Sequence, residues 1–150
     1  MILLGSDHGG LHLKNSIAGF LKERGIEYKD CGTFDGDSVD YPDYAEKVAG
    51  PVSRGEADSG ILVCGTGIGI SIAANKFPGV RAALATDSFM GQMAKEHNNA
   101  NILVLGGRTT TSDSGQEIVA AWLDAKFEGG RHQLRLDKIS AIEKRFKGCV

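Results

Sequence analysis

One cysteine stands at the end of an apolar run and is followed at once by a glycine-rich turn. The run is Ile61-Leu62-Val63, the cysteine is Cys64, and the turn is Gly65-Thr66-Gly67-Ile68-Gly69. A strand, such a turn and a helix start place backbone N–H groups around one point. These groups can hold a small anion, or an oxyanion formed during a reaction. A thiol beside them is favoured as a thiolate, which makes Cys64 a candidate for chemistry.

The same residues can be compared with other motifs that contain such a turn. A Walker phosphate loop needs a lysine that is absent between Gly65 and Ser71, and Gly69 falls one position early for a dinucleotide fingerprint. A thiol-based phosphatase would need an arginine where Ile70 stands. Two alternatives stay open: Cys64 as a buried strand-end cysteine beside a tight turn, and a non-catalytic nucleotide-binding module.

Strand-like and helix-like segments alternate along the chain. Strands are predicted at 2–4, 26–31, 61–64, 80–85 and 102–105, and helices at about 11–21, 41–50, 70–74, 87–96, 112–126 and 133–146. Such alternation implies right-handed crossovers and a parallel sheet that is covered on both faces. The predicted fold class is therefore α/β, a doubly wound, three-layer αβα Rossmann-like sandwich with a five-stranded parallel sheet.

Three finer expectations concern single elements. The strand at 26–31 is more polar than the others, which favours an edge of the sheet. The helix that starts near Tyr41 is predicted to bend or end at Gly50-Pro51. Ile70 and Ile72 are both assigned to the buried side of the helix after the glycine-rich turn.

A doubly wound sheet binds ligands at the carboxyl ends of its strands, where the strand order reverses. That edge is expected to gather Asp7, His8, residues 64–69, Asp87 and Arg108. His97 and Asn98 come just before the last strand and would need a helix end that reaches the same edge. Asp7 also suits a helix N-cap and His97 a helix C-cap, so each has a structural interpretation as well.

The composition of the chain limits the kinds of partner, metal and compartment that can be expected. The 150 residues have the length of one domain, and the 17 basic and 19 acidic residues are mixed along the chain, which favours neither nucleic acid nor a membrane surface. No apolar run approaches the ~20 residues of a membrane span, so a cytoplasmic protein is expected. Cys31, Cys64 and Cys149 form no C-x-x-C pair, and His8 and His12 lack a third ligand. No disulfide and no metal are expected.

Six motifs in order resemble the type B ribose-5-phosphate isomerases, which belong to a wider family that includes galactose-6-phosphate and allose-6-phosphate isomerases. The motifs are Asp7-His8-Gly9, Asp40-Tyr41-Pro42, Cys64 to Ser71, Ala74-Asn75-Lys76, His97-Asn98 and Gly129-Gly130-Arg131-His132. The resemblance implies a cofactor-free and metal-free aldose–ketose isomerase of the non-oxidative pentose phosphate pathway. It would convert D-ribose 5-phosphate to D-ribulose 5-phosphate through a cis-enediolate, as a homodimer or tetramer. A six-carbon sugar phosphate stays open, because pocket depth depends on the loops.

The resemblance also implies roles for single residues. Cys64 matches the base that abstracts the proton, Thr66 is a further catalytic residue, and His97 matches the acid that helps to open the furanose ring. The expected substrate contacts are Gly65, Gly67, Ile68 and Gly69 for the enediolate oxygens, Asp7 for sugar hydroxyls, Tyr41 as a wall, and Asn98. One departure is Asn99, where an aspartate is usual; less negative charge is then expected near His97.

The phosphate ligands implied by the resemblance come from both ends of the chain. They are His8, Arg108, Arg131 and Arg135, and the last helix, at about 133–146, would reach a site on the partner subunit. Arg131 and Arg135 are one helical turn apart, so both can face one anion. An ordinary solvated basic face is the alternative for this pair.

Overall fold

One parallel sheet with helices around it forms the structure, a computed structural model that describes residues 1–147. Cys149 lies outside the described residues. The strands are β1 (Ile2–Ser6), β2 (Tyr28–Asp30), β3 (Ser59–Cys64), β4 (Ala82–Leu84) and β5 (Ile102–Gly106). The helices are α1 (Leu11–Glu23), α2 (Tyr41–Ser53), α3 (Ile68–Ala74), α4 (Ser88–Glu96), α5 (Ser112–Asp124) and α6 (Arg131–Phe146), with a short 3-10 helix, η1 (His8–Gly10), before α1. The predicted α/β fold class is confirmed.

The order of the strands sets the position of the candidate site. The strands pair in parallel in the order β2-β1-β3-β5-β4, and β2 lies at an edge, as expected. The chain leaves β1 toward β2 and then returns past β1 to form β3, so the order reverses between β1 and β3. In a doubly wound sheet the ligand site forms outside the carboxyl ends of two such strands.

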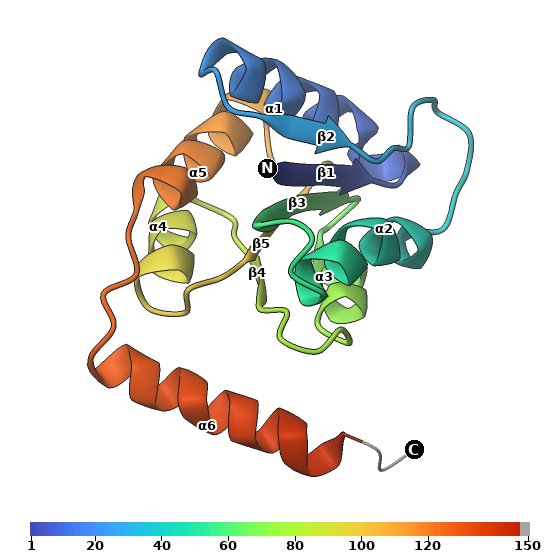
Figure 1. Cartoon of the computed structure of the whole chain (residues 1–150). Coiled ribbons are helices and arrows are strands. Elements are labelled where there is room, and N and C mark those ends of the chain that lie inside the picture. Colours follow the sequence, from blue (N-terminus) through green and yellow to red (C-terminus); the bar gives the residue numbers. More distant parts are fainter. Residues whose placement is uncertain (148–150) are drawn as a thin grey trace.

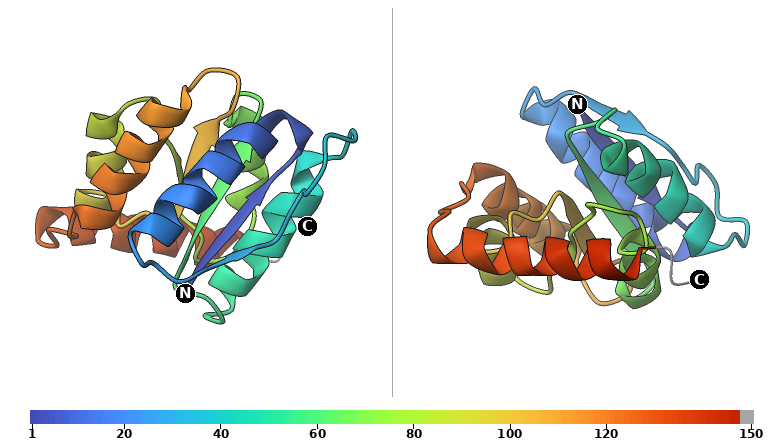
Figure 2. Two further views of the ribbon diagram at one scale, coloured as in Figure 1. Left: turned by 90° about the horizontal axis from the view of Figure 1, so that it is seen from above. Right: turned by 60° about the horizontal axis from the view of Figure 1, so that its bottom comes forward.

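Alternating side chains of the central strands contribute to two separate cores. Ile61 and Val63 of β3 pack with α1, α4 and α5 on one face of the sheet, whereas Leu62 and Cys64 pack with α2 and α3 on the other. Figures 1 and 2 show these two helical layers. Successive side chains of a strand point to opposite faces, so an unbroken apolar strand requires cover on both.

Some boundaries and burial assignments differ from the expected ones. α2 continues through Pro51 to Ser53, because a proline in the last turn removes only one backbone donor. Ile72, expected on the buried side of α3, is 58% exposed, whereas Ile70 is fully buried. Residues two apart on a helix are rotated by roughly 200°, so these two side chains cannot share a face. α6 begins at Arg131, earlier than expected.

α6 lies outside the three layers. Figure 1 and the right view of Figure 2 show it running along the β4 side of the molecule. Its buried residues are His132 and Leu136, and Glu143 accepts hydrogen bonds from the backbone N–H of Gly79. Leu134, Ile139, Ile142 and Phe146 are exposed large apolar residues of this helix. Within residues 1–147, no helix is long and apolar enough to cross a membrane.

Candidate active site

The turns that follow β1, β3 and β5 meet at the carboxyl edge of the sheet. The N–H of Gly107 donates to the carbonyl of Cys64 (2.7 Å), and the N–H of Arg108 donates to the carbonyl of Gly65 (2.9 Å). On the other side of β3, the N–H of Asp7 donates to the carbonyl of Val63 (3.3 Å). These bonds bring Asp7, Cys64 and Arg108 to one edge, as the sequence predicted.

Cys64 faces the glycine-rich turn. Its Sγ accepts a hydrogen bond from the N–H of Gly67 at 3.2 Å, and the residue is only 4% exposed. An N–H that donates to sulfur stabilises negative charge there. Gly67 adopts φ 78°, and a Cβ at this position would lie 3.0 Å from the carbonyl oxygen of Leu105, so only glycine fits. The Thr66 hydroxyl accepts from the N–H of Ile68, which fixes the turn on its outer side.

Tyr41 and Asp7 flank this turn. A Cβ on Gly69 would lie 2.6 Å from Cζ of Tyr41, so the ring packs directly against the turn and forms a wall beside it. Asp7 is buried, and its carboxylate accepts from the N–H of Gly10 at 3.1 Å. The predicted capping role of Asp7 is confirmed, for the 3-10 helix η1 that precedes α1.

His8 and Arg108 provide donors for an anion at the same edge. The Nδ1 atom of His8 accepts from the N–H of Val39 at 3.2 Å, so a neutral ring carries its proton on Nε2 and presents that atom as a donor. The exposed Arg108 guanidinium lies over the turn, because a Cβ on Gly65 would be 3.2 Å from its Nη1. Each of these side chains can donate hydrogen bonds to an anion such as phosphate.

His97 and Asn98 do not share the edge that holds Cys64. They lie at the opposite edge of the sheet, where the strands begin, which we call the amino edge. α4 runs back along the sheet and ends at Glu96, His97 is its C-cap, and β5 begins only at Ile102. β5 spans about 13 Å at 3.3 Å per residue. Its last residue pairs with Cys64, and its first with Gly60, the second residue of β3. The C-cap interpretation of His97 is confirmed, but neither residue reaches Cys64 of the same chain.

The start of α6 shares this amino edge with His97. The rings of His97 and His132 stack with their centroids 4.1 Å apart and an angle of 13° between the planes. The N–H of Glu128 donates to the carbonyl of Glu96, which ties the segment before α6 to the end of α4. Arg131 and Arg135 are exposed on the first turns of α6. The candidate residues therefore form two groups, one at each edge.

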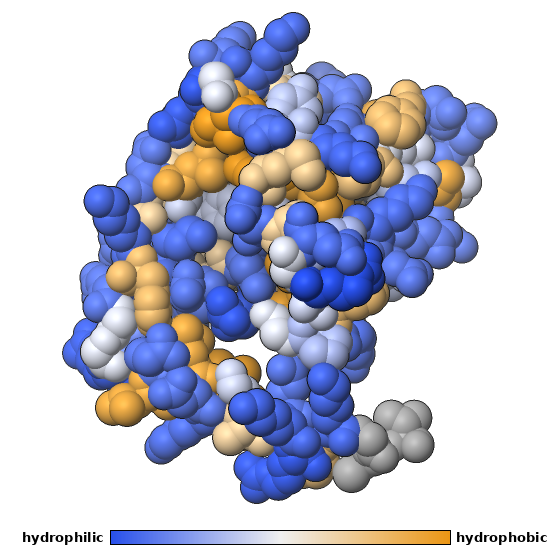
Figure 3. Space-filling model, viewed as in Figure 1, coloured by the Kyte–Doolittle hydropathy of each residue, from blue (hydrophilic) through white to orange (hydrophobic). Residues whose placement is uncertain are grey.

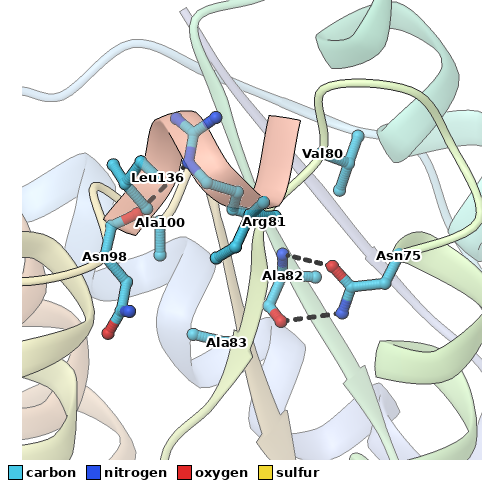
Figure 4. Close-up of a pocket in the computed structure, with 9 residues that line it drawn as sticks. Asn75, Val80, Arg81, Ala82, Ala83, Asn98, Ala100 and Leu136 are labelled. Carbon is cyan, nitrogen blue, oxygen red and sulfur yellow. Dashed lines mark hydrogen bonds between the residues drawn. The ribbon is translucent and has the colours of Figure 1, made fainter. Parts of the chain in front are cut away.

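A cavity of about 240 Å³ lies at the amino edge, between β4 and α6, and Figure 4 shows the residues around it. Arg81 donates to the carbonyls of Asn98 and Asn99, and burial lowers the pKa of its guanidinium. The side-chain amide of Asn75 makes two hydrogen bonds to the backbone of Ala82, each 2.9 Å long. These bonds occupy backbone groups on the free edge of β4.

One group of side chains could in principle hold a metal. Ligand atoms of His97, Glu128 and His132 lie within 4.8 Å of one another, and no other such group occurs in residues 1–147. The lone pair of a ring nitrogen lies in the ring plane, so two nearly parallel stacked rings do not direct their lone pairs at one ion. The tetrahedral geometry that zinc prefers would require both rings to turn.

Sequence reasoning missed the partners of His97. His132 belongs to the motif Gly129-Gly130-Arg131-His132, but no role was predicted for this histidine. The spacing of Glu128 and His132, one helical turn, is a signal for a carboxylate–imidazole pair, and the structure places Oε2 of Glu128 3.2 Å from Nε2 of His132. The stacking on His97 has no local signal, because it joins segments that pack only in the folded chain.

Comparisons with known proteins identify a family and a set of similar structures. The family model described as Ribose/Galactose Isomerase matches residues 2–139. The chain is 49% identical to ribose-5-phosphate isomerase B of Escherichia coli strain K12 over 96% of this chain and 97% of that protein. Among solved structures, it resembles the Clostridium thermocellum ribose-5-phosphate isomerase B with a TM-score of 0.94 and 57% identity, covering 97% of this chain and 98% of that one. It also resembles the Mycoplasma genitalium enzyme with bound ribulose 5-phosphate, with a TM-score of 0.92 and 46% identity over 95% of each chain.

Proposed function

The chain belongs to the ribose/galactose isomerase family, and on this premise we propose that it interconverts D-ribose 5-phosphate and D-ribulose 5-phosphate. The observation that carries the proposal is the position of Cys64. Its sulfur accepts from a backbone N–H in a glycine-rich turn, at a sheet edge that also holds His8 and Arg108 as phosphate donors. Relatives whose names state this activity match the chain over nearly its whole length.

Cys64 is the proposed base of the isomerisation. As a thiolate it takes the proton from C2 of the open-chain aldose and returns a proton to C1, while the hydroxyl proton of O2 passes to O1, so no redox cofactor is required. The intermediate is a cis-enediolate, whose developing negative charge is stabilised by backbone N–H groups of residues 65–69. Thr66 keeps this turn in shape through its bond to the N–H of Ile68. Tyr41 and Asp7 border the sugar.

The active site is proposed to be shared between two subunits. In one chain, Cys64 lies at the carboxyl edge, whereas His97, Asn98, Arg131 and Arg135 lie near the amino edge. A two-fold dimer can bring the amino edge of each chain to the carboxyl edge of the other, because such an interface is reciprocal. The partner's Arg131 and the partner's Arg135 then bind the phosphate, and the partner's His97 helps to open the furanose ring.

Exposed apolar side chains support a second copy of this chain as the occupant of that face. Ile68 and Ile72 of α3 and Ile139 and Ile142 of α6 are each exposed by half or more. A groove of about 660 Å³ runs between α6 and the segment 75–80. Figure 3 shows apolar residues on α6 and an opening between this helix and the rest of the molecule. Exposed apolar side chains beside a groove are typical of an interaction site.

The proposal includes a homodimer as the smallest active unit, with a tetramer as a pair of such dimers, in the cytoplasm. Its direct test is the rate at which purified protein forms ribulose 5-phosphate from ribose 5-phosphate, beside allose 6-phosphate and galactose 6-phosphate at equal concentration. The pentose phosphate is expected to be the preferred substrate. Turnover of a six-carbon substrate alone would change the assigned sugar, and nucleotide binding without any isomerisation would refute the proposal.

A further inference from the structure

His132 is the side chain on which His97 rests. The two rings stack at 4.1 Å with only 13° between their planes. His97 is half-buried, whereas His132 is 4% exposed. One ring is therefore held by the protein interior, and the other lies against it with one side open.

Three contacts surround the His132 ring: two backbone hydrogen bonds hold the chain on either side of it, and one carboxylate lies close to its Nε2 atom. The N–H of His132 donates to the carbonyl of Gly129 at 3.0 Å, and the N–H of Glu128 donates to the carbonyl of Glu96 at 3.0 Å. The second bond links the α6 segment to the residue that directly precedes His97. Oε2 of Glu128 lies 3.2 Å from Nε2 of His132. The segment before α6 is thus hydrogen-bonded to the end of α4.

The Nε2 atom of His132 is itself an unusual group. It is buried and has no hydrogen-bond partner of good geometry in the described chain, because the nearby Glu128 carboxylate is poorly aligned with it. A buried polar atom without a partner costs stability, and an apolar residue of similar size would avoid that cost. This cost indicates that the His132 ring does more than fill space in the core.

We propose that His132 is a positioning residue that holds the His97 ring, by stacking, in the orientation needed for ring opening. The inference rests on the proposed isomerase function and on His97 as the ring-opening acid. A flat aromatic platform leaves the His97 nitrogens free at the ring edge, whereas a hydrogen-bonding support would occupy one of them. His132 itself does not touch the substrate.

Ring opening can be separated from proton transfer by the choice of substrate. Ribose 5-phosphate is a furanose and must open before C2 loses its proton. Ribulose 5-phosphate cannot close a five-membered ring, because its O5 carries the phosphate. In D2O the base can remove a C1 proton from ribulose 5-phosphate, exchange it with solvent and return a deuteron to C1. This exchange requires the base and the enediolate site but no ring opening.

The test compares His132→Phe, which keeps a flat ring, with His132→Leu, which fills the site without one. For His132→Leu we expect kcat/KM with ribose 5-phosphate to fall roughly ten- to a hundredfold, the scale of a misplaced catalytic group. Its C1 exchange with ribulose 5-phosphate, followed by NMR, is expected to stay close to wild type. His132→Phe is expected to recover most of the turnover. His12→Leu, a change at an exposed histidine of α1, is the matched control and should alter neither rate.

Each result decides between the proposal and a simpler role. Equal losses of turnover and exchange in His132→Leu would mean that the residue only supports the fold. Retention of both rates, or a His132→Phe variant no better than His132→Leu, would also overturn the positioning role. If His132→Leu does not fold, His132→Met takes its place as the variant without a flat ring. A His132→Phe variant with much lower turnover than wild type would show that the imidazole itself is needed and would also overturn the proposal. Wild-type protein without isomerase activity would instead refute the proposed function.

Discussion

At the scale of single residues, the two described cysteines have different environments. Cys64 receives a hydrogen bond from the N–H of Gly67, whereas burial raises the pKa of the Cys31 thiol above its usual value. Raising that pKa keeps Cys31 protonated and unreactive at neutral pH. The difference comes from the glycine-rich turn, which supplies an N–H donor to one sulfur only.

Cys64→Ser is therefore expected to fold normally and to lose most of kcat, by two or more orders of magnitude. A hydroxyl has a similar volume but is a far weaker base than a thiolate. Steady-state kinetics with ribose 5-phosphate and a thermal melt measure both effects, and Cys31→Ser is the matched control that keeps its activity. Near-normal kcat in Cys64→Ser would place the base elsewhere.

A second expectation at this scale concerns metal. Activity is expected to survive dialysis against EDTA, because the proposed base is a thiol and the proposed phosphate ligands are arginines and a histidine. The cluster of His97, Glu128 and His132 does not direct its ring nitrogens at one point. Turnover is measured before and after dialysis. Activity that is lost and then restored by added Mg²⁺ or Zn²⁺ would contradict this expectation.

The sequence predicted the carboxyl edge of the site because its residues follow buried strands directly. Asp7, Cys64 and Arg108 each stand just after or at a strand end, and the topological rule for parallel sheets brings such residues together. The pair of His97 and His132 could not be found in this way. Their contact joins the end of α4 to the start of α6, and it depends on packing that no local pattern encodes.

At the scale of elements, close approach between η1 and β3 positions the Asp7 turn beside Cys64. A Cβ on Gly10 would lie 2.6 Å from both the carbonyl carbon and the oxygen of Val63, so the turn can approach the strand only with glycine there. The backbone of β3 cannot move aside, because it is paired on both sides. The short distance between the Asp7 turn and β3 therefore depends on the absence of a side chain at Gly10.

Gly10→Ala is expected to destabilise the protein by about 1 to 3 kcal/mol, the usual cost of overpacking. The control is Gly19→Ala on the exposed face of α1, where an added Cβ meets nothing within 4 Å. That change is expected to stabilise by about 0.5 to 1 kcal/mol, because alanine favours the helix. Urea unfolding curves of both variants give the two free energies. If Gly10→Ala and Gly19→Ala had the same free energy of unfolding, η1 and β3 could move apart without loss of stability, and the expectation would be wrong.

Helix faces show where sequence reasoning at this scale was correct and where it was wrong. Trp122 and Ile118 of α5 are four residues apart, a spacing that predicts one shared helix face, and both are buried. Ile72 was assigned to the core because it is apolar, but its rotation from Ile70 places it on the outer face of α3. In the proposed dimer a neighbouring subunit would cover this isoleucine, and the sequence of one chain carries no direct signal for that contact.

At the scale of the whole molecule, the two edges of the sheet hold complementary halves of the proposed site. Arg131 and Arg135 are exposed on α6, and Cys64 lies at the other edge. Loss of both arginines removes two charge-assisted phosphate contacts, each worth about 1.5 to 3 kcal/mol. The double variant Arg131→Ala/Arg135→Ala is therefore expected to be almost inactive on its own, with little change in thermal stability.

Mixing two inactive variants tests whether the site is shared. Cys64→Ser and Arg131→Ala/Arg135→Ala are combined in equal amounts under conditions that exchange subunits. If the arginines serve the partner's site, each heterodimer has one site with both defects and one site with none. Random exchange places half of the subunits in heterodimers, so activity is expected to return to about a quarter of the wild-type value. If the arginines serve their own chain, every site keeps one defect. Native mass spectrometry measures the fraction of heterodimer, and full exchange without recovered activity would rule out the shared site.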